Sequence, residues 1–175
     1  MDYFRGILIE GTAMKMVNPT GKGDSLAKTD DRIFTISAGT ASGRLIGGNL
    51  TVLSHILGSN YLPDFKGAIL FVEDVNEEIY KVDRMLTQLK LAGILNQIAG
   101  FVFGKCTDCG PSKGGFGSLT LENLFDDHIK PLKIPAFSGA MIGHIKDKFT
   151  VPLGIEATID ASEGSIKLKE AAVIV

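Results

Sequence analysis

The sequence lacks any apolar run of about 18 residues or more, the length that a membrane-spanning helix needs. It also lacks a long apolar segment behind a basic N-terminus, so we expect no secretory signal. Neither sign of charge dominates, because 18 Lys and Arg face 20 Asp and Glu, for a formal net charge of -2. These absences predict a protein with no membrane partner and no general attraction to nucleic acid.

Cysteine is scarce. The two cysteines, Cys106 and Cys109, form a C-x-x-C pair in the stretch GKCTDCGPSKGG, which is typical of a loop. Such a pair can be a redox site or half of a zinc site. However, the chain has no second C-x-x-C and no cluster of His, Asp and Glu at ligand spacing, so no metal site is predicted. The favoured interpretation is two loop cysteines kept reduced in the cytosol, and hence a cytoplasmic protein.

Two common catalytic loops are also missing. The polar stretch over residues 17–31 contains Gly21 and Lys22, but Met16 stands where a P-loop needs glycine, and Gly23 where it needs Ser or Thr. We therefore expect a solvated loop there. No G-x-S-x-G elbow exists either, since GTASGR and AFSGAM both fail its spacing. The chain thus offers no recognisable serine nucleophile.

What is present is the composition of a folded domain. Hydrophobic residues make up 45% of the chain and charged residues 22%, a balance that supports a core. The length of 175 residues suits a single domain over residues 1–175. Glycine is abundant: it accounts for 21 of the 175 residues, whereas its usual share is roughly 7%. This excess predicts many loops with positive φ or close backbone approach.

The clearest unit is a predicted strand, helix and strand in the middle of the chain. Residues 68–72 form a continuous apolar run, typical of a strand buried on both faces. A helix follows over about residues 77–95, with apolar side chains at 3-and-4 spacing on one face. Residues 98–103 are a second apolar run, which we expect to stop at Gly104. This is a βαβ unit with parallel strands and a right-handed crossover.

Shorter elements are predicted on both sides of this unit. Asn49 is the predicted N-cap of a helix over residues 50–57, which Gly58 ends. The other predicted elements are β-like runs over residues 6–10, 32–37, 154–159 and 165–168, and a helix over residues 119–129. The predicted fold class is α/β, with a parallel βαβ core and an antiparallel β layer.

Two residues are candidates for catalysis. Glu73 directly follows the apolar run, at the carboxyl end of a parallel strand, where open α/β sheets place functional residues. A carboxylate at the edge of the core can orient an imidazole, although Glu73 and Asp74 can equally be a simple strand end. His144 follows Gly143 in an apolar, glycine-rich segment, and histidine exchanges protons near neutral pH. A surface histidine before a charged loop is the alternative for His144.

Four segments carry a family resemblance: GGNLTVLSHILGS, AILFVEDVNEEIYKVDRMLTQLKLAGIL, IAGFVFGKCTDC and IPAFSGAMIGHIKDKFTVPLGIEATID. Together they resemble the carboxyl-terminal half of the L,D-carboxypeptidases. These are serine peptidases that include muramoyltetrapeptide carboxypeptidase and the microcin C immunity proteins. The similarity covers about residues 43–175, whereas residues 1–42 are a weakly matched lead-in.

The resemblance implies a Ser–Glu–His triad, in which the E-D pair of the family maps onto Glu73 and the G-H pair onto His144. The serine and the oxyanion-hole donors lie in an amino-terminal half of the family that has no counterpart here. Family members remove the terminal D-alanine of cytoplasmic muropeptides during peptidoglycan recycling. They use no metal or organic cofactor and are commonly homodimers. Their carboxyl-terminal half resembles the swivelling β/β/α fold.

We therefore expect the carboxyl-terminal catalytic half of an L,D-carboxypeptidase, inactive alone because it lacks the serine. Its expected partners are the muropeptide substrate, an amino-terminal nucleophile domain and a second copy of the chain. The alternatives are half of a microcin C immunity-type amide hydrolase, or a non-catalytic binding or dimerisation module. The sequence departs from the family in the stretch GAMIG before His144, where members often have a Pro-containing segment. This difference bears on how the substrate fits the site.

Overall fold

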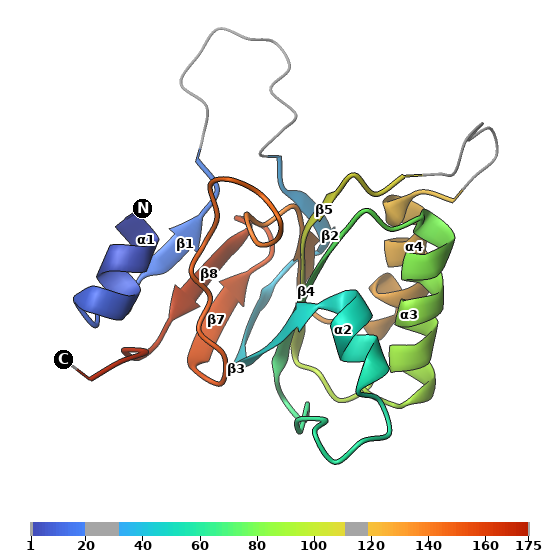
Figure 1. The fold of residues 1–175 in the computed structure, drawn as a ribbon, viewed down its shortest axis with the longest axis horizontal. Coiled ribbons are helices and arrows are strands. Elements are labelled where there is room, and N and C mark those ends of the chain that lie inside the picture. The colour runs from blue at the N-terminus through green and yellow to red at the C-terminus, as the bar shows by residue number, and fades with distance from the viewer. Residues whose placement is uncertain (1, 20–31, 111–118, 175) are drawn as a thin grey trace, which may run out of the picture.

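A computed structural model of the chain describes residues 2–19, 32–110 and 119–174 (Figure 1). The expected solvated loop around Gly21 and Lys22 lies outside these ranges. The strands are β1 (Lys15–Val17), β2 (Phe34–Ser37), β3 (Thr40–Asn49), β4 (Ile69–Val75), β5 (Gly100–Thr107), β6 (Ala136–Ser138), β7 (Glu156–Asp160) and β8 (Ser165–Leu168). The helices are α1 (Asp2–Phe4), α2 (Leu50–His55), α3 (Ile79–Leu91) and α4 (Leu121–His128), with a π-helical turn η1 (Arg5–Ile9) and a 3-10 turn η2 (Lys130–Leu132).

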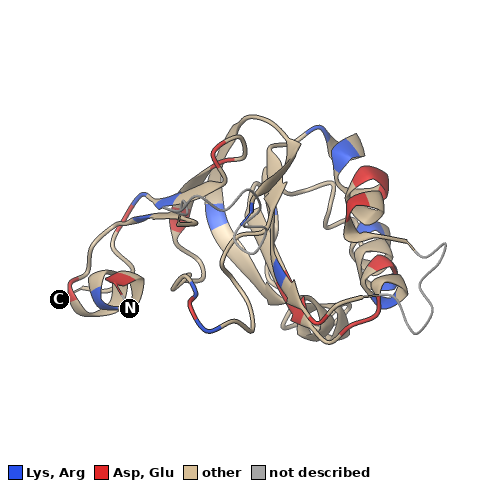
Figure 2. Cartoon of the chain, turned by 90° about the horizontal axis from the view of Figure 1, so that it is seen from above, with Lys and Arg blue, Asp and Glu red and all other residues tan. Residues whose placement is uncertain are grey.

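The strand β3 joins two differently built halves of one eight-stranded sheet, whose order is β1-β8-β7-β3-β4-β5-β6-β2. Residues 40–44 of β3 pair antiparallel with β7, and residues 45–49 pair parallel with β4. Because β3 changes partner along its length, the antiparallel strands turn away from the parallel ones. Figures 1 and 2 show the resulting three layers: antiparallel strands, parallel strands, and the helices α2, α3 and α4.

Two apolar clusters fill the spaces between these layers. Leu70 and Val72 of β4 pack toward the helices, whereas Ile69 and Phe71 pack toward the antiparallel strands. Successive side chains of a strand point to opposite faces, so an unbroken apolar run is what a strand between two layers requires. The β/β/α layering agrees with the predicted fold class, and the mixed α/β fold is confirmed.

The predicted βαβ unit is also confirmed, but its strands are longer than expected. β4 continues through Glu73 and Asp74 to Val75, and β5 continues past Gly104 to Thr107. Gly104 does not stop the strand; instead it admits a neighbouring chain segment, because a Cβ there would lie 2.4 Å from the carbonyl oxygen of Ile142. The register between β4 and β5 shifts between Val72 and Asp74, an irregularity that is common beside functional sites.

The N-terminal region departs from the prediction. Residues 6–10 were expected to form a strand, but Arg5–Ile9 is a helical turn in which Glu10 N–H donates to the carbonyl of Arg5 at 3.0 Å. Ile7 is buried there, while Leu8 and Ile9 are exposed, so the run does not alternate on a sheet. The unpredicted strand β1 takes the sheet position beside β8.

Close approach of β3 to β4 gives a first prediction. A Cβ on Gly47 would lie 1.7 Å from the carbonyl oxygen of Phe71 in the neighbouring strand. Gly47→Ala is therefore expected to lower the free energy of unfolding by about 1–3 kcal/mol or more, as overpacking does. Denaturant unfolding of the purified chain measures this. Gly110→Ala is the matched control, since no atom lies within 4 Å of a Cβ placed there; equal losses in both variants would contradict the packing argument.

Candidate active site

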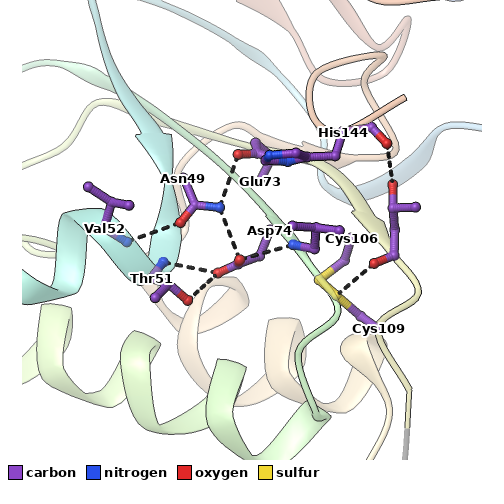
Figure 3. Close-up of polar contacts among 10 residues, drawn as sticks. Asn49, Thr51, Val52, Glu73, Asp74, Cys106, Cys109 and His144 are labelled. Atoms are coloured by element: carbon purple, nitrogen blue, oxygen red, sulfur yellow. Dashed lines mark hydrogen bonds and ion pairs between the residues drawn. A yellow bond between two sulfur atoms is a disulfide. The ribbon is translucent and has the colours of Figure 1, made fainter. Parts of the chain in front are cut away.

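Glu73 and His144, far apart in sequence, meet in the folded chain. The Nδ1 atom of His144 lies 2.9 Å from Oε2 of Glu73, across a sequence separation of 71 residues (Figure 3). The Glu73 side chain is 9% exposed, whereas the His144 side chain is 56% exposed. The pair thus has an inner carboxylate and an outer imidazole that solvent or a ligand can reach.

This contact determines which imidazole nitrogen carries the proton. A carboxylate only accepts hydrogen bonds, so in the neutral ring Nδ1 holds the proton and Nε2 keeps its lone pair. Within residues 2–19, 32–110 and 119–174, Nδ1 is the only ring nitrogen of His144 with a hydrogen-bond partner. Such an imidazole can accept a proton at Nε2 from a hydroxyl group and return it, while the carboxylate stabilises the charged ring.

The segment that carries His144 is held against the end of β5. Lys105 N–H donates to the carbonyl of Ile142 at 2.7 Å, and the Thr107 hydroxyl donates to the carbonyl of His144 at 3.2 Å. Gly143, between these anchors, has a φ of +135°, and a Cβ there would lie 3.1 Å from Oε2 of Glu73. Glycine therefore allows the turn that brings the imidazole next to the carboxylate.

Asn49 and Asp74 extend the pair into the core. Asn49 caps α2, as predicted, because its side-chain oxygen accepts from Val52 N–H at 3.0 Å. Its side-chain nitrogen donates to Oε1 of Glu73 at 3.2 Å and to Oδ1 of Asp74 at 3.0 Å. Neither Asn49 nor Asp74 was predicted at the site from the sequence. The available signal was that both lie at carboxyl ends of strands, where parallel neighbours bring side chains together.

The cysteines correct one expectation. Cys106 and Cys109 form a disulfide, with their Cα atoms 5.3 Å apart, so the interpretation of two reduced loop cysteines is wrong for this structure. Cys106 belongs to β5 rather than to a loop. The chain turns at Asp108, whose φ is +55°, and Cys109 N–H donates to the carbonyl of Cys106 at 3.2 Å. This tight turn brings the two sulfur atoms together.

A hollow of about 550 Å³ flanks the His144 segment. Its lining includes Lys105, Thr107, Met141, Ile145 and Asp147. In the described part of the chain, no group of three or more His, Cys, Asp and Glu side chains is arranged to hold a metal ion. The described helices include none that is both long and apolar enough to span a bilayer.

Comparison with known proteins places the chain in a family. Residues 42–159 match the family described as the LD-carboxypeptidase C-terminal domain. A "Probable murein peptide carboxypeptidase" of Bacillus subtilis is 41% identical over 125 residues, which cover 71% of this chain and 39% of the relative. The microcin C7 self-immunity protein MccF of Escherichia coli is 32% identical over 136 residues, which cover 76% of this chain and 38% of the relative.

A solved structure supports the same relationship. The muramoyltetrapeptide carboxypeptidase from Oxalobacter formigenes aligns with a TM-score of 0.74 and 32% sequence identity, covering 95% of this chain and 53% of that one. The chain therefore spans less than half of the two curated relatives and about half of the solved one.

The tautomer of His144 gives a second prediction. In Glu73→Gln the side-chain oxygen is best placed facing the Asn49 donor, which turns the new NH₂ group toward Nδ1 of His144. Nδ1 must then accept, so the ring proton is expected to move from Nδ1 to Nε2. Two-dimensional ¹H–¹⁵N spectra of the histidine rings measure this change.

His128 is the reference in the same spectra. Its Nε2 lies 2.7 Å from Oδ1 of Asp83, far from the site in sequence. Asp83→Asn should alter the His128 signals and leave those of His144 unchanged. An unchanged His144 tautomer in Glu73→Gln would show that Glu73 does not orient the ring.

Proposed function

The chain belongs to the LD-carboxypeptidase family as its C-terminal domain, and from that premise we propose that it is the catalytic C-terminal half of a serine L,D-carboxypeptidase. The proposed substrate is a cytoplasmic muropeptide, which loses its terminal D-alanine during peptidoglycan recycling. The observation that carries the proposal is the Glu73–His144 pair, with its 2.9 Å contact through Nδ1 and its exposed imidazole. The names of the murein and muramoyltetrapeptide carboxypeptidase relatives favour this substrate class.

In the proposed mechanism, a serine from a segment outside these 175 residues attacks the carbonyl carbon of the scissile amide. His144 takes the hydroxyl proton at Nε2 as the new C–O bond forms. The tetrahedral intermediate then collapses, and His144 gives the proton to the departing amine of D-alanine. Water repeats the cycle on the acyl-enzyme, with His144 again as base, and restores the serine.

Glu73 acts through His144 in this mechanism. Its buried carboxylate keeps the proton of the neutral ring on Nδ1, so that the lone pair at Nε2 faces outward. When the ring becomes charged, the carboxylate stabilises it at short range and with little competition from water. The hollow of about 550 Å³ that is lined by Thr107 and Ile145, next to the His144 segment, is the proposed place for the peptide.

A second substrate class has its own support. The similarity to the microcin C7 self-immunity protein favours amide hydrolysis of a microcin-type substrate as the alternative. The same histidine and carboxylate would serve both reactions, because each requires proton transfer to and from a serine. Parallel assays with a muropeptide and a microcin-type aminoacyl sulfamoyl adenylate distinguish the two.

A cytoplasmic location, homodimer formation and an amino-terminal nucleophile domain are further parts of the proposal. In a reducing cytosol, the Cys106–Cys109 disulfide would open to two thiols. The proposed dimer is tested by the molar mass of the purified chain in solution.

The missing nucleophile gives a third prediction. The 175-residue chain alone should release no D-alanine from a muropeptide tetrapeptide, because the serine and the oxyanion hole are required for the reaction. Joined to a nucleophile-bearing segment, it should release D-alanine. In that enzyme, His144→Ala and Glu73→Gln should each lower kcat by about 10⁴-fold or more.

His55→Ala is the control for this assay, because His55 is an exposed residue that the mechanism does not use. Its kcat should stay at the unsubstituted value. Near-normal turnover of His144→Ala would remove His144 from the mechanism. Release of D-alanine by the 175-residue chain alone would show that it contains its own nucleophile.

A further inference from the structure

We propose that Asp74 is a positioning residue for this site: through the side-chain amide of Asn49 it holds the Glu73 carboxylate, and thereby the imidazole of His144. The four side chains form a continuous run of hydrogen bonds from the core to the surface (Figure 3). The catalytic meaning of the inference rests on the proposed function. The arrangement itself can be tested on the chain without any reaction.

Asp74 is a buried carboxylate with both oxygens occupied. Its residue exposure is only 2%. Oδ1 accepts from the Asn49 side chain at 3.0 Å and from Val75 N–H at 2.9 Å. Oδ2 accepts from the backbone N–H and the hydroxyl of Thr51, each at 2.9 Å. Burying a carboxylate is costly unless it is fully hydrogen-bonded, and Asp74 meets this condition with donors from three residues.

These bonds leave the Asn49 amide a single orientation. Its NH₂ group lies between two acceptors, Oε1 of Glu73 and Oδ1 of Asp74, while its oxygen accepts from Val52 N–H. A flipped amide would set its oxygen against both carboxylates and its nitrogen against a donor. One amide hydrogen is therefore held by Asp74, which directs the other toward Glu73.

The bond from Asn49 matters because the terminal torsion of a glutamate is soft. His144 holds Oε2 of Glu73, and Asn49 holds Oε1. Without the second bond the carboxylate can rotate, and the proton on Nδ1 of His144 loses its fixed acceptor.

An amide cannot replace this carboxylate. All four groups that contact Asp74 donate to it, and three of them are N–H groups that cannot accept, so in Asp74→Asn the new NH₂ group faces at least one N–H donor whichever way it turns. If it faces Asn49, the bond that orients Asn49 is lost; if it faces Thr51, the backbone N–H of Thr51 loses its acceptor. Asp74→Asn is thus nearly isosteric but disrupts the proposed positioning.

The test uses ¹H–¹⁵N spectra of the histidine rings in the 175-residue chain. The unsubstituted chain should show a protected Nδ1–H signal for His144. In Asp74→Asn we expect loss of that signal by exchange with water, and a smaller share of the Nδ1–H tautomer. The His128 signals, which report the separate contact with Asp83, should not change.

Two further variants separate positioning from stability. Asn49→Ser keeps a side chain that can cap α2 but removes the amide, so it should cause the same loss at His144. Thr51→Val removes the hydroxyl contacts to Asp74 and to the Met85 sulfur and leaves the Asn49 contact of Asp74. It should lower the melting temperature without changing the His144 signals. If Asp74 had only a structural role, variants with the same loss of stability would affect His144 alike.

The outcomes are decisive in each case. A folded Asp74→Asn chain with an unchanged His144 spectrum would overturn the proposal. If Asp74→Asn does not fold, an unchanged His144 spectrum in Asn49→Ser would overturn the proposal, because Asn49 is the link between Asp74 and Glu73. In the enzyme joined to its nucleophile segment, Asp74→Asn should lower kcat by about 10²-fold with little change in KM, as a small misplacement does. If the His144 spectrum does not change in Asp74→Asn, the positioning role is wrong. If the joined enzyme without substitutions releases no D-alanine, the proposed function is wrong.

Discussion

The parallel register of β3 on β4 is the constraint on which the site depends. It sets Asn49 directly opposite Glu73 at the carboxyl ends of the two strands. A slip of one residue would move every side chain of a strand to its other face and separate the two residues. Gly47, packed against the backbone of Phe71, allows the close approach that keeps this register. The same register leads β3 into α2, whose first turn supplies donors to Asp74.

The layers explain why this register produces a protected carboxylate. β4 is covered by helices on one face and by antiparallel strands on the other, so a polar group at its end is shielded from water. Glu73 and Asp74 both lie there, and each is satisfied by donors rather than by solvent. His144 reaches Glu73 on a loop that is bonded to β5, so a rigid sheet positions an exposed imidazole.

Much of the core could be predicted from local patterns. The unbroken apolar run at residues 68–72, followed by a long segment of helical spacing and a second apolar run, predicts a buried strand and its crossover helix. Residues 6–10 show where such patterns fail: a short apolar run fits a strand or a helical turn equally, and packing decided for the turn. The disulfide was missed because a cytosolic location was expected to keep both thiols reduced, and sequence separation alone does not tell whether two nearby cysteines point at each other.

The sequence by itself determined the α/β class, the βαβ core and the two residue types needed for proton transfer, because these follow from periodicity and side-chain chemistry. It also carried the family resemblance that pairs Glu73 with His144. Only the tertiary structure decided that Glu73 bonds Nδ1 rather than Nε2 of His144. It also decided that Asn49 hydrogen-bonds to both Glu73 and Asp74. These contacts join three chain segments, at Asn49, at Glu73 and Asp74, and at His144, whose separations along the chain carry no geometric information. Their distances were set by strand register and by the packing of the layers.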